Sequence, residues 1–153
     1  MLKDVGLQRQ HEIEVRIMIP LITELIKVFG KEATLDVVRR SMADVGLAQG
    51  RQLREMADGD GIEDFARQLS LFSEGGAQEQ EILAVSETRL DVNISKCVYA
   101  ETCKKLGDTE LGYELLCARD PYLFKGFNPR MKMNRTKTIM QGDECCDFRI
   151  SLK

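Results

Sequence analysis

The spacing of apolar residues changes near residue 80 of this 153-residue chain, from a helical repeat to the alternation of a strand. Before that point the pattern predicts helices over about 7–29, 33–57 and 62–72. Within the first helix, Pro20 predicts a kink or a break into two pieces. The apolar stripe of that helix, expected to face the core, consists of Ile13, Ile17, Leu21, Leu25 and Val28.

After residue 80 the chain is predicted to form two β-hairpins separated by helices. The hairpins are expected at about 80–96 and 130–152, the second one with strands 131–140 and 145–152. The order of helices, hairpin, helices and hairpin predicts an α+β fold. We expect an antiparallel sheet of about four strands, covered on one face by helices.

The composition is that of a globular protein, and the length suits a single domain over 1–153. We expect a helical region at 1–76 and the functional site in 77–153. The net charge is −3 and no basic block stands out, which argues against a nucleic acid partner. The N-terminus lacks the apolar core of a signal peptide, and no apolar run reaches the roughly 18 residues of a membrane span. We therefore expect a cytoplasmic protein with no membrane partner.

All five cysteines lie between Cys97 and Cys146. An odd number leaves at least one cysteine outside any set of disulfides, so free thiols are expected. The six-residue step from Cys97 to Cys103 and the adjacency of Cys145 and Cys146 do not suit a zinc site. We expect no metal and no cofactor. The single histidine, His11, has polar neighbours and is expected to be exposed.

Three side chains in the last third of the chain suit chemistry. Cys117 and Asp120 are three residues apart, so on a helix they share a face. Cys117 is a candidate nucleophile, although a nearby acid raises the pKa of a thiol, and Asp120 is an alternative base for activating water. In its predicted strand, Arg135 alternates in step with the apolar residues, so its side chain is expected on the same face as theirs. A charge on that core-facing side needs a partner. That partner is either an acid such as Asp120 or the carboxylate of a substrate.

The segment from Cys97 to Arg149 resembles the L-2-amino-thiazoline-4-carboxylic acid hydrolases. The matching residues are Cys97-x-Tyr99-Ala100, Gly107, Glu110-Leu111-Gly112, Cys117-x-x-Asp120, Phe127-Asn128-Pro129, Arg135-Thr136-x-Thr138-Ile139-Met140-x-Gly142 and Cys146-Asp147-Phe148-Arg149. This family resembles in turn the 4-vinyl reductase and Golgi-transport ligand-binding domains. The resemblance implies an α+β fold with a small-molecule site between helices and sheet.

The reaction implied by the resemblance opens a thiazoline ring that carries a carboxylate, giving a carbamoyl-cysteine. We expect Cys117 or water activated by Asp120 to attack the ring, and Asp120 or Asp147 to supply a proton. Arg135 would hold the carboxylate. The family positions Cys97, Tyr99 and Asn128 are further candidates for binding the substrate. A non-catalytic ligand-binding or sensor domain of the same fold is the alternative, and a homodimer is possible in either case.

Overall fold

The computed structural model describes residues 5–153, so the first four residues of the predicted helical region lie outside the described residues. The helical elements are α1 Leu7–Phe29, α2 Lys31–Met56, α3 Ile62–Ala66, α4 Ser70–Ser73, the 3₁₀ turn η1 Glu74–Gly76, α5 Val98–Lys105, α6 Thr109–Gly112, the π-helical turn η2 Tyr113–Cys117, α7 Asp120–Phe127 and the 3₁₀ turn η3 Ile139–Gln141. The strands are β1 Gln78–Val85, β2 Arg89–Cys97, β3 Met131–Asn134 and β4 Cys146–Leu152.

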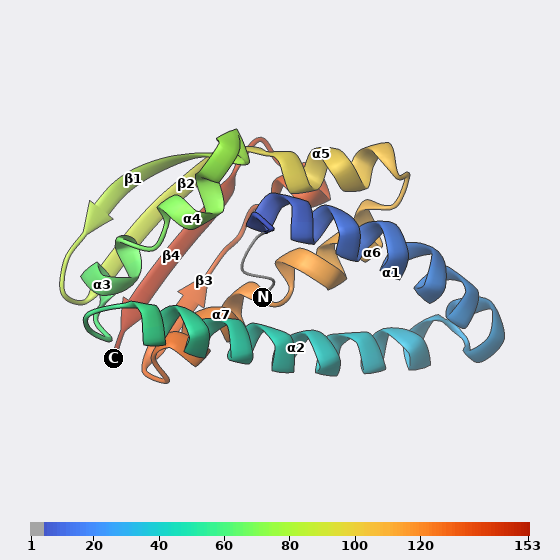
Figure 1. Ribbon diagram of the computed structural model, residues 1–153, viewed down its shortest axis with the longest axis horizontal. Helices are drawn as coiled ribbons and strands as arrows, with labels where there is room; N and C mark the ends of the chain where they lie inside the picture. The colour runs from blue at the N-terminus through green and yellow to red at the C-terminus, as the bar shows by residue number, and fades with distance from the viewer. Residues whose placement is uncertain (1–4) are drawn as a thin grey trace.

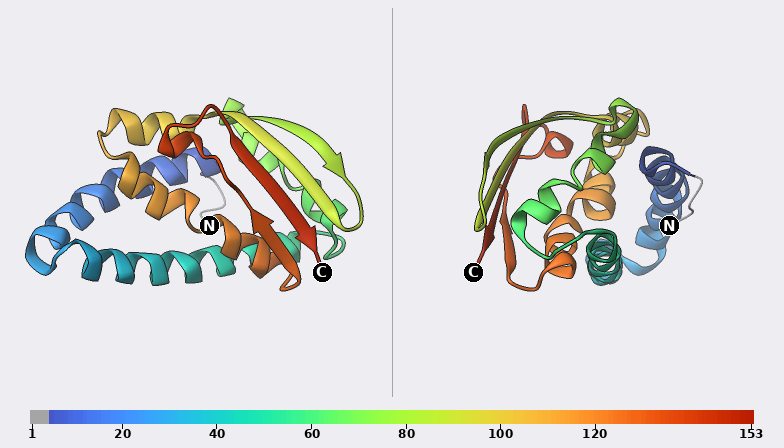
Figure 2. Two further views of the ribbon diagram at one scale, coloured as in Figure 1. Left: turned by 180° about the vertical axis from the view of Figure 1, so that it is seen from behind. Right: turned by 60° about the vertical axis from the view of Figure 1, so that its left-hand side comes forward.

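Within residues 5–153 the strands form one antiparallel sheet in the order β1-β2-β4-β3. The helices pack against one face of this sheet and leave the other face uncovered (Figure 2). The predicted α+β fold is therefore confirmed. In the central pair, Val92 lies opposite Phe148 and Ile94 opposite Cys146 on the covered face, whereas Asp91 lies opposite Arg149 on the uncovered face.

Helices α1 and α2 form a long hairpin that extends past the sheet (Figure 1). The turn between them is a single residue, Gly30, with φ of +87°, a conformation that side chains other than that of glycine rarely adopt. At its far end α2 crosses α7 at very short range. A Cβ atom at Gly50 would lie 2.0 Å from the carbonyl oxygen of Leu123, and one at Gly126 would lie 2.3 Å from that of Leu47. These glycines bring the two backbones together and so fix where α7 lies over the sheet.

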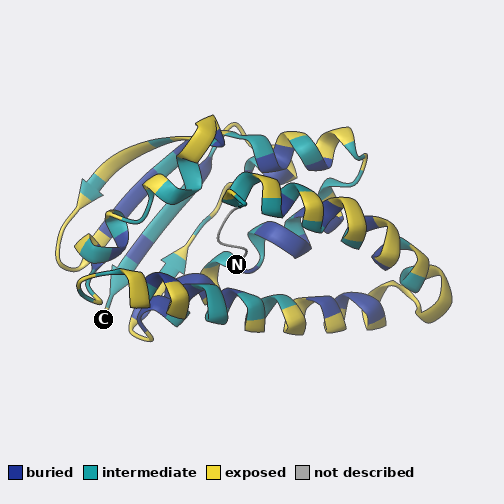
Figure 3. Cartoon of the chain, viewed as in Figure 1, coloured by how far each residue is buried: buried dark blue, intermediate teal, exposed yellow. Residues whose placement is uncertain are grey.

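The buried apolar side chains of residues 5–153 fall into two clusters. One joins α1, α2, α5 and the segment Leu111–Leu116, and the other joins the sheet to α3 and α7. Cys97 and Ile139 pack against both clusters. The central strands β2 and β4 contribute most of the buried strand residues, whereas edge strand β1 is largely exposed (Figure 3).

Helix α1 differs from its prediction in two respects. It continues through Pro20 without a break. Pro20 has no N–H to donate to the carbonyl of Arg16, but both residues lie on the exposed side of the helix, so water can donate to that carbonyl instead. The predicted core stripe is wrong, because its members Ile13, Ile17, Leu21 and Val28 are exposed. The buried face carries His11, Val15, Ile19 and Ile22. α1 has apolar residues on two sides, and packing against α2 and α5 selects one of them.

The second hairpin is shorter than predicted, because β3 ends at Asn134 instead of continuing to residue 140. After that point acidic side chains replace the partner strand as hydrogen-bond acceptors. Asp147 accepts from the backbone N–H groups of Thr136 and Lys137, and Asp143 accepts from that of Thr138. The segment then turns into η3.

No helix within residues 5–153 combines the length and the apolar character that crossing a membrane requires.

Candidate functional site

Asp120 is positioned by an irregular stretch between α6 and α7. The π-helical turn η2 ends at Cys117, and α7 begins at Asp120 with Pro121 in its first turn, where a missing N–H has no consequence. π-Helical turns are often found at functional sites. The Asp120 side chain lies on the side of α7 that faces the sheet, where it shares a cavity wall with Ile94 and Phe148.

A partly open cavity of about 70 Å³ lies between α7, the segment around α3 and α4, and the sheet. It is lined by Phe65, Leu69, Phe72, Gln78, Gln80, Val92, Ile94, Asp120, Leu123, Phe124, Phe148 and Ile150. Of these lining residues, all within the described residues of the chain, only Asp120 is ionisable. The cavity therefore presents one carboxylate and two amides among apolar and aromatic side chains.

Arg135 is the partner of this carboxylate. Its Nη1 donates to Oδ2 of Asp120 at 2.6 Å, and its Nη2 donates to the carbonyl oxygen of Cys117 at 3.1 Å. The guanidinium lies over the rings of Tyr113 and Phe148, at 5.7 and 5.2 Å from their centroids. Only 5% of the Arg135 side chain is exposed, against 27% for Asp120. Asp120 is thus enclosed by protein but accessible from the cavity, whereas Arg135 lies behind it.

Burial determines the protonation of this group of side chains. Desolvation raises the pKa of Asp120, and the nearby charge of Arg135 offsets this only in part. Burial also raises the pKa of Cys117 well above its ordinary value, and the charge of Asp120 adds to the effect. Burial acts to lower the pKa of Arg135, but the charge of Asp120 and the hydrogen bond to it raise the pKa overall. The pair therefore consists of a fixed cation and a carboxyl that protonates more readily than usual.

Two further thiols adjoin the pair. Burial raises the pKa of Cys97, with hydrogen bonds from Ala100, Tyr99 and Gln78 opposing the shift. Burial also raises the pKa of Cys146 to about 11. All five cysteines are among the described residues and carry free thiols. The charge of Asp120 adds to the effect of burial on Cys97, Cys117 and Cys146, and all three thiols are held in the protonated form.

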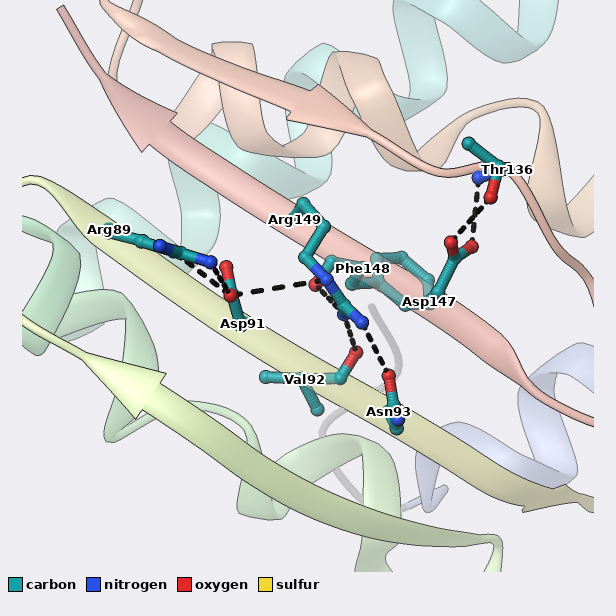
Figure 4. A network of polar contacts seen from close by, with 8 residues as sticks. All are labelled: Arg89, Asp91, Val92, Asn93, Thr136, Asp147, Phe148 and Arg149. Carbon is teal, nitrogen blue, oxygen red and sulfur yellow. Dashed lines mark hydrogen bonds and ion pairs between the residues drawn. The ribbon is translucent and has the colours of Figure 1, made fainter.

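The other predicted site residues lie elsewhere. Asn128 is at the opposite end of α7 from Asp120, where it donates to the carbonyl of Asp60 and accepts from the N–H of Arg130. Asp147 accepts two hydrogen bonds from Thr136 on the uncovered face of the sheet (Figure 4). Burial acts to raise the pKa of Asp147, but the hydrogen bonds it accepts lower the pKa overall. Neither side chain lines the cavity.

Tyr99 belongs to a second buried polar group, beneath α1. Its ring lies 4.9 Å from that of His11, and its hydroxyl is 3.4 Å from the carbonyl oxygen of Phe72. The prediction that His11 is exposed is wrong: it is buried, with Nε2 2.8 Å from Nη2 of Arg119. Burial, together with the charge of Arg119, lowers the pKa of His11 to about 3, so the ring is neutral and accepts from Arg119. Arg119 also pairs with Glu14 at 3.3 Å.

A protein-family model described as L-2-amino-thiazoline-4-carboxylic acid hydrolase matches residues 10–150. The chain belongs to this family. The match covers the site region and nearly all of the N-terminal helices, well beyond the segment from Cys97 to Arg149 that carries the resemblance in the sequence.

Solved structures share the fold of this hydrolase-family chain at low sequence identity. The phenol-responsive sensory domain of the transcription activator PoxR, with phenol, has a TM-score of 0.57 at 10% identity and covers 87% of this chain and 71% of its own. A trafficking protein particle complex subunit 3 from Naegleria fowleri, covalently bound to palmitic acid, has a TM-score of 0.55 at 12% identity, with 94% and 95% covered. At such identities the likeness concerns the fold alone. No match is found among curated proteins.

Several residues lining the cavity of this family member were not among the predicted site residues. Gln78 and Gln80 precede the apolar run from which the first hairpin was predicted, although their spacing of two gives them the same face as Ile82. Phe65 and Phe72 come from the short helical segments and could not be assigned to a cavity from periodicity. Within residues 5–153, no group of three or more His, Cys, Asp or Glu side chains is arranged to hold a metal ion.

Proposed function

We propose that this chain hydrolyses a small cyclic amidine or isothiourea bound in the cavity, with Asp120 as the proton carrier. The observation that carries the proposal is the placement of Asp120: a carboxyl at the wall of an otherwise uncharged cavity, with a pKa raised by burial. A carboxyl whose pKa is raised above its ordinary value is better suited than an ordinary one both to accept and to return a proton. Membership of a hydrolase family supports this reaction class.

The proposed reaction uses one water molecule. The carboxylate of Asp120 takes a proton from water as the water oxygen bonds to the ring carbon between sulfur and nitrogen, and the electron pair of the carbon–nitrogen double bond moves onto nitrogen. That pair re-forms the double bond as the tetrahedral intermediate breaks its carbon–sulfur bond, and the protonated Asp120 returns the proton to the departing sulfur. The proton of the new hydroxyl group then moves to nitrogen, which converts the isourea into a urea. The products are a thiol and a urea, and Asp120 is again a carboxylate. Arg135, bonded to Asp120, keeps the carboxylate in position throughout.

A direct attack by Cys117 is less well supported. The thiolate is the nucleophilic form of cysteine. Burial and the neighbouring charge of Asp120 hold the thiol of Cys117 in its protonated form, and Cys117 is not among the residues that line the cavity. These observations favour water as the nucleophile.

Ligand binding without hydrolysis is the second candidate function. It is favoured by the apolar character of the cavity, whose walls include the rings of Phe65, Phe72, Phe124 and Phe148. Aromatic and apolar linings with few polar groups are typical of small-molecule sites in general. A related fold occurs in a sensory domain that responds to phenol.

Turnover assays separate these two functions. Purified protein is incubated with 2-aminothiazoline and with its 4-carboxylate, and ring opening is followed by chromatography and mass spectrometry. We expect Asp120→Asn to lower kcat by about 10²- to 10⁴-fold, the usual contribution of general acid–base catalysis. Asp44→Asn, which alters an exposed acid on α2, is the matched control and should retain full activity.

Ring opening by a folded Asp120→Asn variant at the wild-type rate would contradict the proposed mechanism. Binding of either compound without any turnover by the wild-type protein would favour the binding-domain function.

A further inference from the structure

Two glutamine side chains form the wall that edge strand β1 contributes to the cavity. Gln78 and Gln80 are two residues apart, and both line the cavity on the covered side of the sheet. Nε2 of Gln80 donates to Oε1 of Gln78 at 2.9 Å, and Gln78 also makes a hydrogen bond with the sulfur of Cys97. These linked bonds hold the amide of Gln80 in one orientation.

Gln80 keeps two hydrogen-bonding groups for a ligand. Its amino group has two N–H donors, and Gln78 accepts from one of them. Among residues 5–153, none donates to the carbonyl oxygen of Gln80. In a planar amide the carbonyl oxygen and one N–H lie side by side. The free edge of Gln80 is therefore an acceptor next to a donor.

Gln80 and Asp120 reach the cavity from different sides. The strand order β1-β2-β4-β3 puts β1 and β3 at opposite edges of the sheet, and α7, which carries Asp120, packs against β3 (Figure 1). Ile94 of β2 lies between Gln80 of β1 and Cys146 of β4 in the register of the sheet, and it lines the cavity. Neighbouring strands are about 4.8 Å apart. A small ring over Ile94 would have the amide on one side and the carboxyl on the other.

A cyclic isothiourea has an edge that matches the amide of Gln80. Its reacting carbon bears an amino group, a ring nitrogen and sulfur. The amino group is a donor and the ring nitrogen an acceptor, and a side-chain amide pairs with such an edge through two hydrogen bonds, as glutamine does with adenine. When both nitrogens face Gln80, the sulfur points the opposite way, toward Asp120.

We infer that Gln80 determines which bond of the substrate breaks, by pairing with the two nitrogens and turning the sulfur toward Asp120. The inference rests on the proposed function, in which Asp120 carries the proton. In the tetrahedral intermediate three atoms compete to leave, each with one proton. Departure of sulfur gives a thiol and a urea, departure of the amino group gives ammonia and a cyclic thiocarbamate, and departure of the ring nitrogen gives an amine and an open thiocarbamate. The proton from Asp120 selects sulfur because sulfur faces it.

Product analysis tests this inference. Wild-type protein, Gln80→Met and Gln80→Val are each given 2-aminothiazoline-4-carboxylate with nitrogen-15 in its amino group, and the products are separated and identified by mass spectrometry. Wild-type protein should retain the label in a urea. In both variants the share of carbon–nitrogen cleavage should rise about tenfold, the effect expected from loss of neutral hydrogen bonds. Gln52→Met, which changes an exposed glutamine on α2, is the matched control and should give the wild-type products.

A binding comparison tests the same contact without turnover. Thiazoline-4-carboxylate lacks the amino group, and its affinity and that of 2-aminothiazoline-4-carboxylate are measured by titration calorimetry near pH 7. Wild-type protein should bind the amino compound about tenfold more tightly. In Gln80→Met most of this difference should disappear, because the acceptor for the amino group is gone. In Gln52→Met the difference should stay as in wild type.

Folding of the variants is checked by circular dichroism. Gln80 lies on a largely exposed edge strand, and valine favours strands, so the two variants are expected to fold. NMR of the wild-type protein gives a test that needs no variant. The side-chain amide signals of Gln80 should shift further with the amino compound than with thiazoline-4-carboxylate, and equal shifts would overturn the inference.

These measurements distinguish the inference from the proposed function. Ring opening by the wild-type protein, with the same products from a folded Gln80→Met variant, overturns the inference and leaves the hydrolase in place. An affinity difference that does not depend on Gln80 also overturns the inference. Binding without ring opening, with an affinity difference that does depend on Gln80, contradicts the hydrolase and supports the pairing of Gln80 with the two nitrogens.

Discussion

The two faces of the sheet each hold an aspartate paired with arginine, and burial gives the two aspartates opposite properties. On the covered face Asp120 pairs with Arg135, and desolvation raises the pKa of the carboxyl. On the uncovered face Asp91 accepts from Arg89, with Arg149 at 4.0 Å, and the hydrogen bond from Arg89 lowers the pKa of Asp91. The same pair of residue types thus yields a carboxyl suited to proton transfer in one place and a carboxylate that keeps its charge to lower pH in the other.

The difference arises from what covers each carboxylate. Only 7% of the Asp91 side chain is exposed, but its cover is a single layer of arginine side chains at the surface, and 65% of the Arg89 side chain is in contact with solvent (Figure 4). Arg149 is held by the carbonyl of Val92 and the side chain of Asn93. Asp120, in contrast, has packed helices and sheet around it. Low exposure alone therefore does not predict the direction of a pKa shift.

The largest expected contrast is in stability when each arginine is removed. Arg135→Met leaves Asp120 buried without its partner, so the free energy of unfolding should fall by roughly 3–5 kcal/mol. Arg89→Met should cost much less, because ion pairs at the surface contribute little to stability. Urea unfolding followed by circular dichroism at pH 7 measures both. Equal losses in the two variants would remove the distinction between the faces.

Acid should partly rescue the Arg135→Met variant. The pKa of Asp120 is raised in the folded protein, so its protonated form is favoured there and stability rises as pH falls from the folded pKa toward the unfolded value of about 4. Without Arg135 the pKa of Asp120 rises further, and the deficit relative to wild type should shrink as pH is lowered from neutrality toward the unfolded pKa of about 4. A deficit that is constant across this range would show that lost packing of Arg135, not the charge of Asp120, is responsible.

A double-mutant cycle gives the next effect in size. Asp120→Asn removes the charge that Arg135→Met leaves unpaired, so the double variant should be more stable than the two single losses predict, by roughly 2–3 kcal/mol. The corresponding cycle for Asp91 and Arg89 should give less than about 1 kcal/mol. Additive losses at Asp120 and Arg135 would indicate that their 2.6 Å contact does not couple them energetically.

For Asp91 the dependence on pH has the opposite sign. Its pKa is lowered in the folded protein, so its stabilising contribution is present above the unfolded pKa of about 4 and is lost as pH falls through the lower folded value. Asp91→Asn should therefore lower the free energy of unfolding by about 1 kcal/mol at neutral pH. The difference from wild type should shrink as pH falls below the unfolded pKa and through the lower folded pKa, and a difference that stays constant into strong acid would contradict the charge-based explanation.

Salt should give the smallest contrast. Raising NaCl to about 1 M shortens the screening distance to roughly 3 Å, which weakens exposed pairs most. We expect the effect of Asp91→Asn to shrink by a few tenths of a kcal/mol, and the coupling between Asp120 and Arg135 to remain unchanged. Urea unfolding at low and high salt measures this, and a salt-sensitive coupling at Asp120 would place that pair in contact with solvent.

The sequence by itself determined the fold class and the approximate ends of the main elements. The change of hydrophobic period near residue 80, with the turn residues between segments, follows from local backbone geometry and needs no knowledge of distant segments of the chain. In β4 the apolar residues Cys146, Phe148 and Ile150 alternate with Asp147 and Arg149, and this alternation matches the faces that the structure gives them, the apolar set toward the helices and the charged pair away. Asp120 was identified as a candidate because it shares a helical face with Cys117, and Arg135 because its predicted strand position puts a charge among apolar residues.

Tertiary structure alone decided which partners these residues have. α1 carries two apolar sides, and only packing against α2 and α5 buries the side with His11, so that this histidine becomes a neutral acceptor for Arg119. The sequence left open whether Arg135 pairs with Asp120 or with a substrate. The end of β3 at Asn134 and the close crossing of α2 over α7 at Gly50 bring Arg135 and Asp120 within 2.6 Å of each other. Periodicity reports which face of an element is apolar, whereas desolvation and charge pairing depend on atoms contributed by segments far apart in the chain.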